Sequence, residues 1–357
     1  MIEAHRTLVD SEGDAERRGR FWADYAYVLN TARRLRDTAF ALQQAIDNAD
    51  ALGDVAELAT LTSNLATVKG NLGQVPAALA LALRSLALQE QLGATGGPEG
   101  AVVETYAGLY CGMVGRYDEA LQRLDAALAC FTRDHQPLWI AVASNHKAQF
   151  LIDLGQFARA RQALDYERPP IDHVRARRAT VAARVERALG HSGRALIETA
   201  TTELGPGADP HVRMHVLLEQ ATASEPAVAI ERCDEVERMA LALDFAGVAM
   251  KARILRAHAQ SRGGDAAGAA AAMHALVAQF EDVQPADLYF AQAWWLAAEV
   301  FEANGDGDQA MMALARGALW VRRTALPHVP EAFRDSFLQR NPTNRNLLAA
   351  ADRRLTH

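Results

Sequence analysis

The stretch that decides the fold is ETYAGLYCGMVGRYDEALQRLDAA, residues Glu104–Ala127. Gly108 lies twelve residues before Ala120, Gly115 lies five before it, and Ala127 lies seven after it. A glycine in a turn allows a positive φ, and small residues on either side let two helices approach closely. The stretch therefore predicts a helix, a glycine-containing turn and a second helix.

Small residues equivalent to Ala120 recur along the chain at intervals of 34 to 42 residues. We use them as markers of eight predicted helix pairs: Ala39, Ala78, Ala120, Ala160, Ala195, Ala229, Ala269 and Ala310. Of the eight positions five residues before a marker, six are Gly, and of the eight positions twelve before it, six are Ala or Gly. Because two independent columns keep one period, stacked repeats are favoured over a single helical bundle.

The unit resembles the tetratricopeptide repeat (TPR), whose pattern appears at Gly108–Ala120 as G-x6-G-R-Y-D-E-A. This resemblance implies an all-α fold, a right-handed α-solenoid superhelix of about eight helix pairs. The intervals near 40 residues resemble the C-terminal helical-repeat domain of large ATP-binding LuxR-type activators. In that family such units form a superhelix that senses a ligand or a partner.

The last stretch of the chain breaks the period. Pro330 and Pro342 each follow a residue that suits a helix start, which predicts two short helices. We therefore expect a repeat superhelix over residues 1–325 and capping helices over residues 326–357.

An apolar stripe runs along this tail. Val329, Phe333 and Phe337 recur at i, i+4 and i+8, and we expect them to cover the open face of the final repeat. The tail resembles the C-terminal tail of large bacterial signalling proteins that carry an ATPase and a cyclase or transcription-activator domain. That resemblance is compatible with this chain being one portion of a longer protein.

Composition excludes several classes of function. The net charge of −7, from 37 basic and 44 acidic residues, argues against a domain that contacts nucleic acid. The sequence has no apolar run long enough for a membrane span and no signal peptide. Three scattered cysteines favour a reducing cytoplasm, and neither G-x4-G-K-[ST] nor G-x-S-x-G is present. We expect a cytoplasmic, non-catalytic protein without a cofactor.

One histidine pair has the spacing of metal ligands. His211 and His215 are separated by one helical turn, with Glu219 one turn further, so all three could present ligands on one face. The alternative is a partly exposed helix face, since His211 follows Pro210 at a predicted helix start. Without a general base of the H-E-x-x-H kind, we predict no metal.

An arginine cluster stands out in this acidic chain. In the TPR register the groove-facing positions lie 18, 15, 11, 8 and 7 residues before each marker. For the marker Ala195, three of these five positions are Arg177, Arg184 and Arg187. One interpretation is a framework in which neighbouring carboxylates neutralise the guanidinium groups. The other is a site for an anionic ligand, which requires that the arginines lack internal partners.

The same register predicts a binding groove. It contains Asn145, Gln149, Arg177, Arg184, Arg187, His211, Met214, His258, Arg262, Gln292, Trp295 and Glu299. Long polar side chains with one aromatic suit a peptide or protein segment, and the arginines suit a small anionic effector. We predict a non-catalytic binding domain of a bacterial signalling or transcriptional regulator. Two alternatives are a stand-alone scaffold and the helical-repeat portion of a nucleotide cyclase or signalling ATPase.

Overall fold

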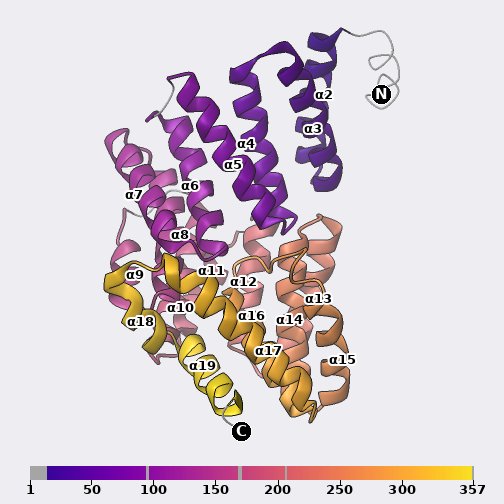
Figure 1. Ribbon diagram of the computed structural model, residues 1–357, viewed down its shortest axis with the longest axis vertical. Helices are drawn as coiled ribbons and strands as arrows, with labels where there is room; N and C mark the ends of the chain where they lie inside the picture. Colours follow the sequence, from indigo (N-terminus) through magenta and orange to yellow (C-terminus); the bar gives the residue numbers. More distant parts are fainter. Residues whose placement is uncertain (1–13, 94–95, 168–170, 206, 356–357) are drawn as a thin grey trace.

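The computed structural model describes residues 14–93, 96–167, 171–205 and 207–355, and every regular element in these ranges is a helix. Consecutive helices form antiparallel pairs that stack into an α-solenoid, which confirms the predicted fold class (Figure 1). The eight pairs are α2 (Ala15–Thr31) with α3 (Leu35–Leu52), α4 (Val55–Asn71) with α5 (Val75–Gln91), α6 (Pro98–Met113) with α7 (Tyr117–Arg133), α8 (Pro137–Asp153) with α9 (Phe157–Ala163), α10 (Asp172–Ala188) with α11 (Arg194–Glu203), α12 (Pro210–Thr222) with α13 (Pro226–Ala242), α14 (Ala246–Arg262) with α15 (Ala266–Val277), and α16 (Phe290–Ala303) with α17 (Gly307–Leu319). None of the helices in the described ranges is both long and apolar enough to cross a membrane.

Close approach explains the two small-residue columns. A Cβ atom at Gly108 would lie 2.9 Å from the Leu124 Cγ and 3.2 Å from the Ala120 carbonyl oxygen, so α6 and α7 touch where the columns meet. In the turn between them Gly115 has φ +89°, a backbone conformation that residues other than glycine rarely adopt. The third pair therefore packs as its sequence predicts.

The fifth marker, Ala195, is wrong. Ala195 is exposed, whereas Ile197 and Ala200 face the core. The turn before α11 is longer than in the other pairs, and Gly193, at φ +61°, ends it. A Cβ at Gly193 would lie 2.7 Å from the Ala183 carbonyl oxygen, so Gly193 makes the close contact that we expected of Ala195.

The solenoid closes on itself through the loop between α15 and α16. The backbone N–H of Gln284 donates to the Gly73 carbonyl oxygen at 2.9 Å, and that of Ala286 donates to the Gly247 carbonyl oxygen at 2.9 Å. Gly73 belongs to the turn between α4 and α5, and Gly247 to α14. This loop therefore joins units that are far apart in a simple stack.

The tail after α17 runs back to the third and fourth helix pairs. After α17 a π-helical segment (Trp320–Ala325) and two 3-10 turns (Leu326–His328 and Glu331–Phe333) lead to α18 (Arg334–Gln339) and α19 (Pro342–Leu355).

The apolar stripe of the tail is buried, and its two phenylalanines contact the third and fourth pairs. The Phe337 ring lies 6.0 Å from the Tyr117 ring of α7, and Ser336 Oγ donates to the Leu154 carbonyl oxygen at 2.7 Å. Helix α19 packs on α16 and α17. We expected the stripe to cover the final repeat, but the ring contacts of Phe333 and Phe337 lie on the third and fourth pairs, and α19 is the tail element that packs on the last pair.

Candidate ligand-binding pocket

A pocket of about 500 Å³ lies inside the solenoid, walled mainly by the first helices of the second to sixth pairs. Its lining residues are Thr67, Gly70 and Asn71 from α4; Tyr106, Leu109, Tyr110 and Met113 from α6; Leu138, Trp139, Val142, Asn145, His146 and Gln149 from α8; His173, Val174 and Arg177 from α10; and His211, Val212 and His215 from α12. Arg33, Asp209, Phe245, Ala286 and Asp287 reach it from turns and loops.

Only part of the predicted groove reaches this pocket. Asn145, Gln149, Arg177 and His211 line it. The other predicted groove residues do not line it. Met214 is fully buried in the core, His258 pairs with Glu299 at 3.4 Å, and Arg262 is exposed. Gln292 and Trp295 are partly buried on α16, and Arg184 and Arg187 contact Glu219.

Several other lining residues also occupy groove-facing positions of the repeat, although the predicted groove does not include them. The groove-facing offsets applied to Ala78 point to Thr67, Gly70 and Asn71, and applied to Ala120 they point to Leu109 and Met113. The repeat pattern could therefore have found them.

A wider cleft of about 790 Å³ lies between α9, α10 and α11. It exists because α9 has only seven residues and α11 only ten, so neither covers the side of α10. None of the predicted groove residues lines it, and we therefore assign the candidate site to the interior pocket.

One wall of the interior pocket is aromatic. Tyr106 meets Trp139 edge to face with ring centroids 6.4 Å apart, and stacks on Tyr110 at 6.4 Å. The Tyr110 hydroxyl donates to the Ala66 carbonyl oxygen at 3.3 Å. Burial raises the pKa of both tyrosines, so the wall stays uncharged and suits an apolar or aromatic group.

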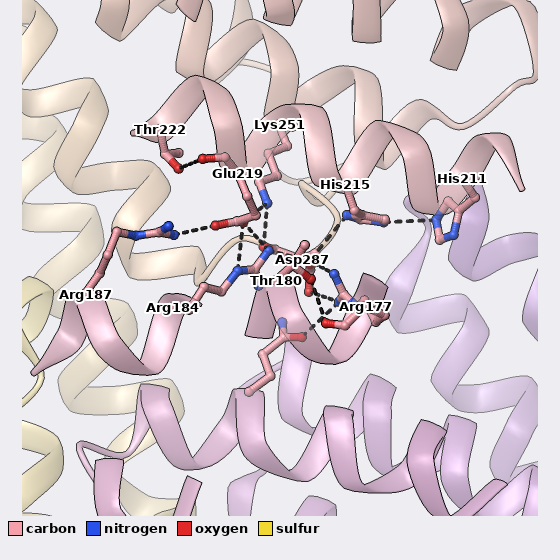
Figure 2. Close-up of polar contacts among 11 residues, drawn as sticks. Arg177, Thr180, Arg184, Arg187, His211, His215, Glu219, Thr222, Lys251 and Asp287 are labelled. Atoms are coloured by element: carbon pink, nitrogen blue, oxygen red, sulfur yellow. Dashed lines mark hydrogen bonds and ion pairs between the residues drawn. The ribbon is translucent and has the colours of Figure 1, made fainter. Parts of the chain in front are cut away.

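The opposite end is polar and is organised by Asp287. Its carboxylate accepts two hydrogen bonds from Arg177 at 2.6 Å each and one from Arg184 Nη2 at 2.6 Å (Figure 2). Burial alone would raise the pKa of Asp287, but the adjacent Arg177 and Arg184 hold it well below its ordinary value. Asp287 adopts φ +58°, an uncommon conformation for a residue other than glycine, which these contacts help to hold.

Glu219 is the second carboxylate of this region. It accepts from Arg184 Nε at 2.8 Å, forms an ion pair with Arg187, and lies 3.6 Å from Lys251 Nζ. Against the effect of burial, these three cations hold the pKa of Glu219 below its ordinary value. Burial and the charge of Arg184 lower the pKa of Lys251 to about 8.

We refer to this group as the buried ionic cluster, and it consists of Arg177, Arg184, Arg187, Lys251, Glu219 and Asp287 (Figure 2). Each of its three arginines contacts a carboxylate. That pairing favours the framework interpretation of Arg184 and Arg187 over a free anion site. Glu219 is also held by cations, so it is not the third metal ligand considered from the spacing of His211 and His215.

Three histidines face the polar end of the pocket. His211 Nε2 and His215 Nε2 lie 3.2 Å apart, and His215 Nδ1 lies 3.3 Å from Asp287 Oδ2. Nδ1 of His146 is buried and has no hydrogen-bond partner within the described part of the chain. Burial, followed by the charge of Arg177, lowers the pKa of His146 and of His211 to about 4, and the pKa of His215 is also lowered by burial. All three imidazoles are therefore neutral near pH 7.

Asp287 and His146 could not be found from the repeat register. Asp287 lies in a loop outside the repeated helices, and its partner Arg177 is 110 residues away in the chain. His146 follows a predicted groove residue directly, so the register places it off the groove.

Comparison with known proteins gives the repeat type. No curated protein sequence matches this chain. Similar solved structures are a tetratricopeptide repeat protein from Parabacteroides merdae (13% identity, TM-score 0.36, covering 90% of this chain and 99% of that one) and a Rap protein complexed with competence and sporulation factor (14%, 0.46, 95% and 98%). A third is the P58(IPK) TPR domain (13%, 0.26, 93% and 99%). The tetratricopeptide repeat family model matches residues 57–133, which hold most of α4 and all of α5, α6 and α7. This part of the all-α solenoid is therefore similar to tetratricopeptide repeats.

Proposed function

We propose that this chain is a non-catalytic binding domain whose interior pocket takes a segment of a peptide or protein. The observation that carries the proposal is convergence: groove positions of the second, third, fourth, fifth and sixth units line one pocket. Tetratricopeptide repeats are typical of domains that bind proteins, and a concave face shared by several units is where such a segment would lie.

The chemistry of the pocket supports a peptide. The aromatic wall of Tyr106 and Trp139 offers a surface for an apolar side chain. Asn145 accepts from the Tyr166 hydroxyl at 2.9 Å through its carbonyl oxygen, which leaves its amide N–H groups for a ligand. With Gln149 beside it, this end can hydrogen-bond a peptide backbone, whose donors and acceptors alternate.

A small anionic effector is a second candidate. Arg177 lines the pocket, and the buried ionic cluster holds four cationic side chains against two carboxylates. An added anion would offset this surplus of positive charge, although it would have to compete with Asp287 for Arg177.

At the level of the whole protein we propose the sensor domain of a cytoplasmic bacterial signalling or transcriptional regulator, similar to the helical-repeat domain of LuxR-type activators. The proposed division places the sensing superhelix at residues 1–325 and capping helices at residues 326–357. A stand-alone scaffold, or the helical portion of a cyclase or ATPase, would use the same fold with a different partner.

Filling the pocket tests the proposal. Val142→Trp places a large ring between lining residues of α8, and Val228→Trp adds the same ring on the exposed side of α13 as a matched control. Each variant is immobilised, exposed to lysate of the source organism, and the retained proteins and peptides are identified by mass spectrometry.

We expect a partner that the parent and Val228→Trp retain and that Val142→Trp loses, with circular dichroism showing that both variants are folded. A partner retained equally by all three would place binding on another face and favour the scaffold alternative.

A further inference from the structure

We propose that His211 and His215 form a binding site for a first-row transition metal ion such as Zn²⁺ at the polar end of the pocket. Their Nε2 atoms lie 3.2 Å apart. Two imidazole nitrogens bound to one tetrahedral zinc at about 2.0–2.1 Å are separated by about 3.3 Å. The pair is therefore already at the spacing that a shared ion requires.

Helix α12 holds both rings in place. The residues are one turn apart on a helix of 13 residues, so their side chains leave the same face. The His211 ring also stacks on Phe245 with centroids 4.8 Å apart. Figure 2 shows the two histidine rings in contact through their Nε2 atoms. Joint coordination would require each ring to turn by about 35°, so that both lone pairs meet at one tetrahedral ion instead of lying along the line between the nitrogens.

Asp287 supplies the outer support that metal-binding histidines usually have. Its Oδ2 atom lies 3.3 Å from His215 Nδ1, on the side of the ring away from His211, at a distance that permits charge interaction but with a geometry that falls short of a hydrogen bond. A carboxylate at Nδ1 favours the tautomer with the proton on that nitrogen, so in the metal-free protein the His215 Nε2 lone pair accepts from His211 Nε2–H. A bound ion would take the place of that shared proton, which would move to His211 Nδ1. Arg177 and Arg184 fix the position of Asp287 in turn.

The site remains open on the pocket side. In the described ranges, no third His, Cys, Asp or Glu ligand atom lies within 4.8 Å of both nitrogens. His146, with its unpartnered Nδ1, lines the same pocket and offers a contact through water. A metal held by two protein ligands keeps positions for water or for a donor atom of a pocket ligand.

The charged side chains around the two histidines determine how tightly the metal ion should bind. Arg177 lies close to both histidines and repels a dication, although Asp287 partly offsets it. With two neutral ligands and this repulsion, we expect binding weaker than at a structural zinc site with four ligands. We also expect an anionic co-ligand such as chloride to strengthen it. The inference does not depend on the proposed peptide binding.

Cobalt titration of the intact, tag-free chain provides the test. After removal of metal with a chelator, Co²⁺ should produce visible d–d absorption that saturates near one equivalent and disappears when Zn²⁺ is added. His211→Gln and His215→Gln should each weaken Co²⁺ binding at least tenfold. His258→Gln removes a histidine that pairs with Glu299 outside the pocket and should leave the titration unchanged.

A second control addresses the other possible site. Asp118, Glu119 and His328 bring ligand atoms within 4.8 Å of one another at the surface, and His328→Gln disables that group. If His328→Gln abolishes the signal and His211→Gln does not, the assignment to the pocket is overturned. Absence of Co²⁺ absorption in the parent overturns it as well. Should His215→Gln fail to fold, His211→Gln decides the outcome, since His211 is only partly buried.

Discussion

Removing an anion and removing a cation from the buried ionic cluster should affect stability in opposite ways. Glu219 is almost fully buried and serves Arg184, Arg187 and Lys251 at once. Glu219→Gln leaves these cations without their shared carboxylate. Breaking a buried pair by removing one partner costs about 3–5 kcal/mol, and we expect a loss of this size.

Lys251→Met removes a surplus charge instead. Lys251 is 2% exposed, and its pKa falls from 10.5 to about 8, which corresponds to a cost of roughly 3 kcal/mol for keeping it charged at pH 7. The variant also loses the hydrogen bond from Nζ to the Asp287 carbonyl oxygen at 3.0 Å, worth about 1 kcal/mol. We therefore expect Lys251→Met to equal the parent or to exceed its stability by up to about 2 kcal/mol.

The pH dependence follows from the same shift. Because the folded pKa of Lys251 lies below the unfolded one, the unfolded state binds more protons between pH 8 and 10.5. The contribution of Lys251 to stability should therefore rise with pH across this window, and the advantage of Lys251→Met should shrink there. Urea unfolding followed by far-UV circular dichroism measures all three proteins at about pH 7 and about pH 9.5.

Two results would refute this reasoning. A loss of several kcal/mol in Lys251→Met would mean that the lysine is required to balance the carboxylates rather than being in surplus. A loss below about 1 kcal/mol in Glu219→Gln would mean that the cations do not depend on Glu219.

Three further predictions follow from the packing. Gly108→Leu should lower the free energy of unfolding by roughly 1–3 kcal/mol through overpacking between α6 and α7, and a melting temperature equal to that of the parent would contradict the contact. Deletion of residues 330–357 should uncover Tyr117 and cause aggregation measurable by light scattering, whereas an equally stable monomer would show that the tail is not a cover. Burial raises the pKa of Asp153 to about 8, so parent stability relative to Asp153→Asn should fall as pH rises from about 4 to about 8, and a constant difference in urea unfolding would contradict it.

The helix pairs were predictable because their period comes from local packing. A small residue is required wherever two helices of one unit cross, and the requirement recurs with every unit. The error at Ala195 shows the limit of this reasoning. A turn that lengthens by a few residues moves the close contact to Gly193, and the interval between markers does not reveal the change because Gly190 still occupies the expected turn position.

The pocket was only half predictable, for a different reason. Repeat reasoning assumes that each unit contacts its neighbours, so it places Arg177 and Arg184 on the concave face but cannot say what lies opposite them. In this solenoid the loop between α15 and α16 returns to the turn between α4 and α5 and to α14, and it brings Asp287 to both arginines. In an open superhelix Arg177 and Arg184 would be available to a ligand, whereas in this closed one they contact Asp287 of the same chain. The pocket positions that remain for a ligand are the aromatic wall, the amides of α8 and the histidine nitrogens that Asp287 does not contact.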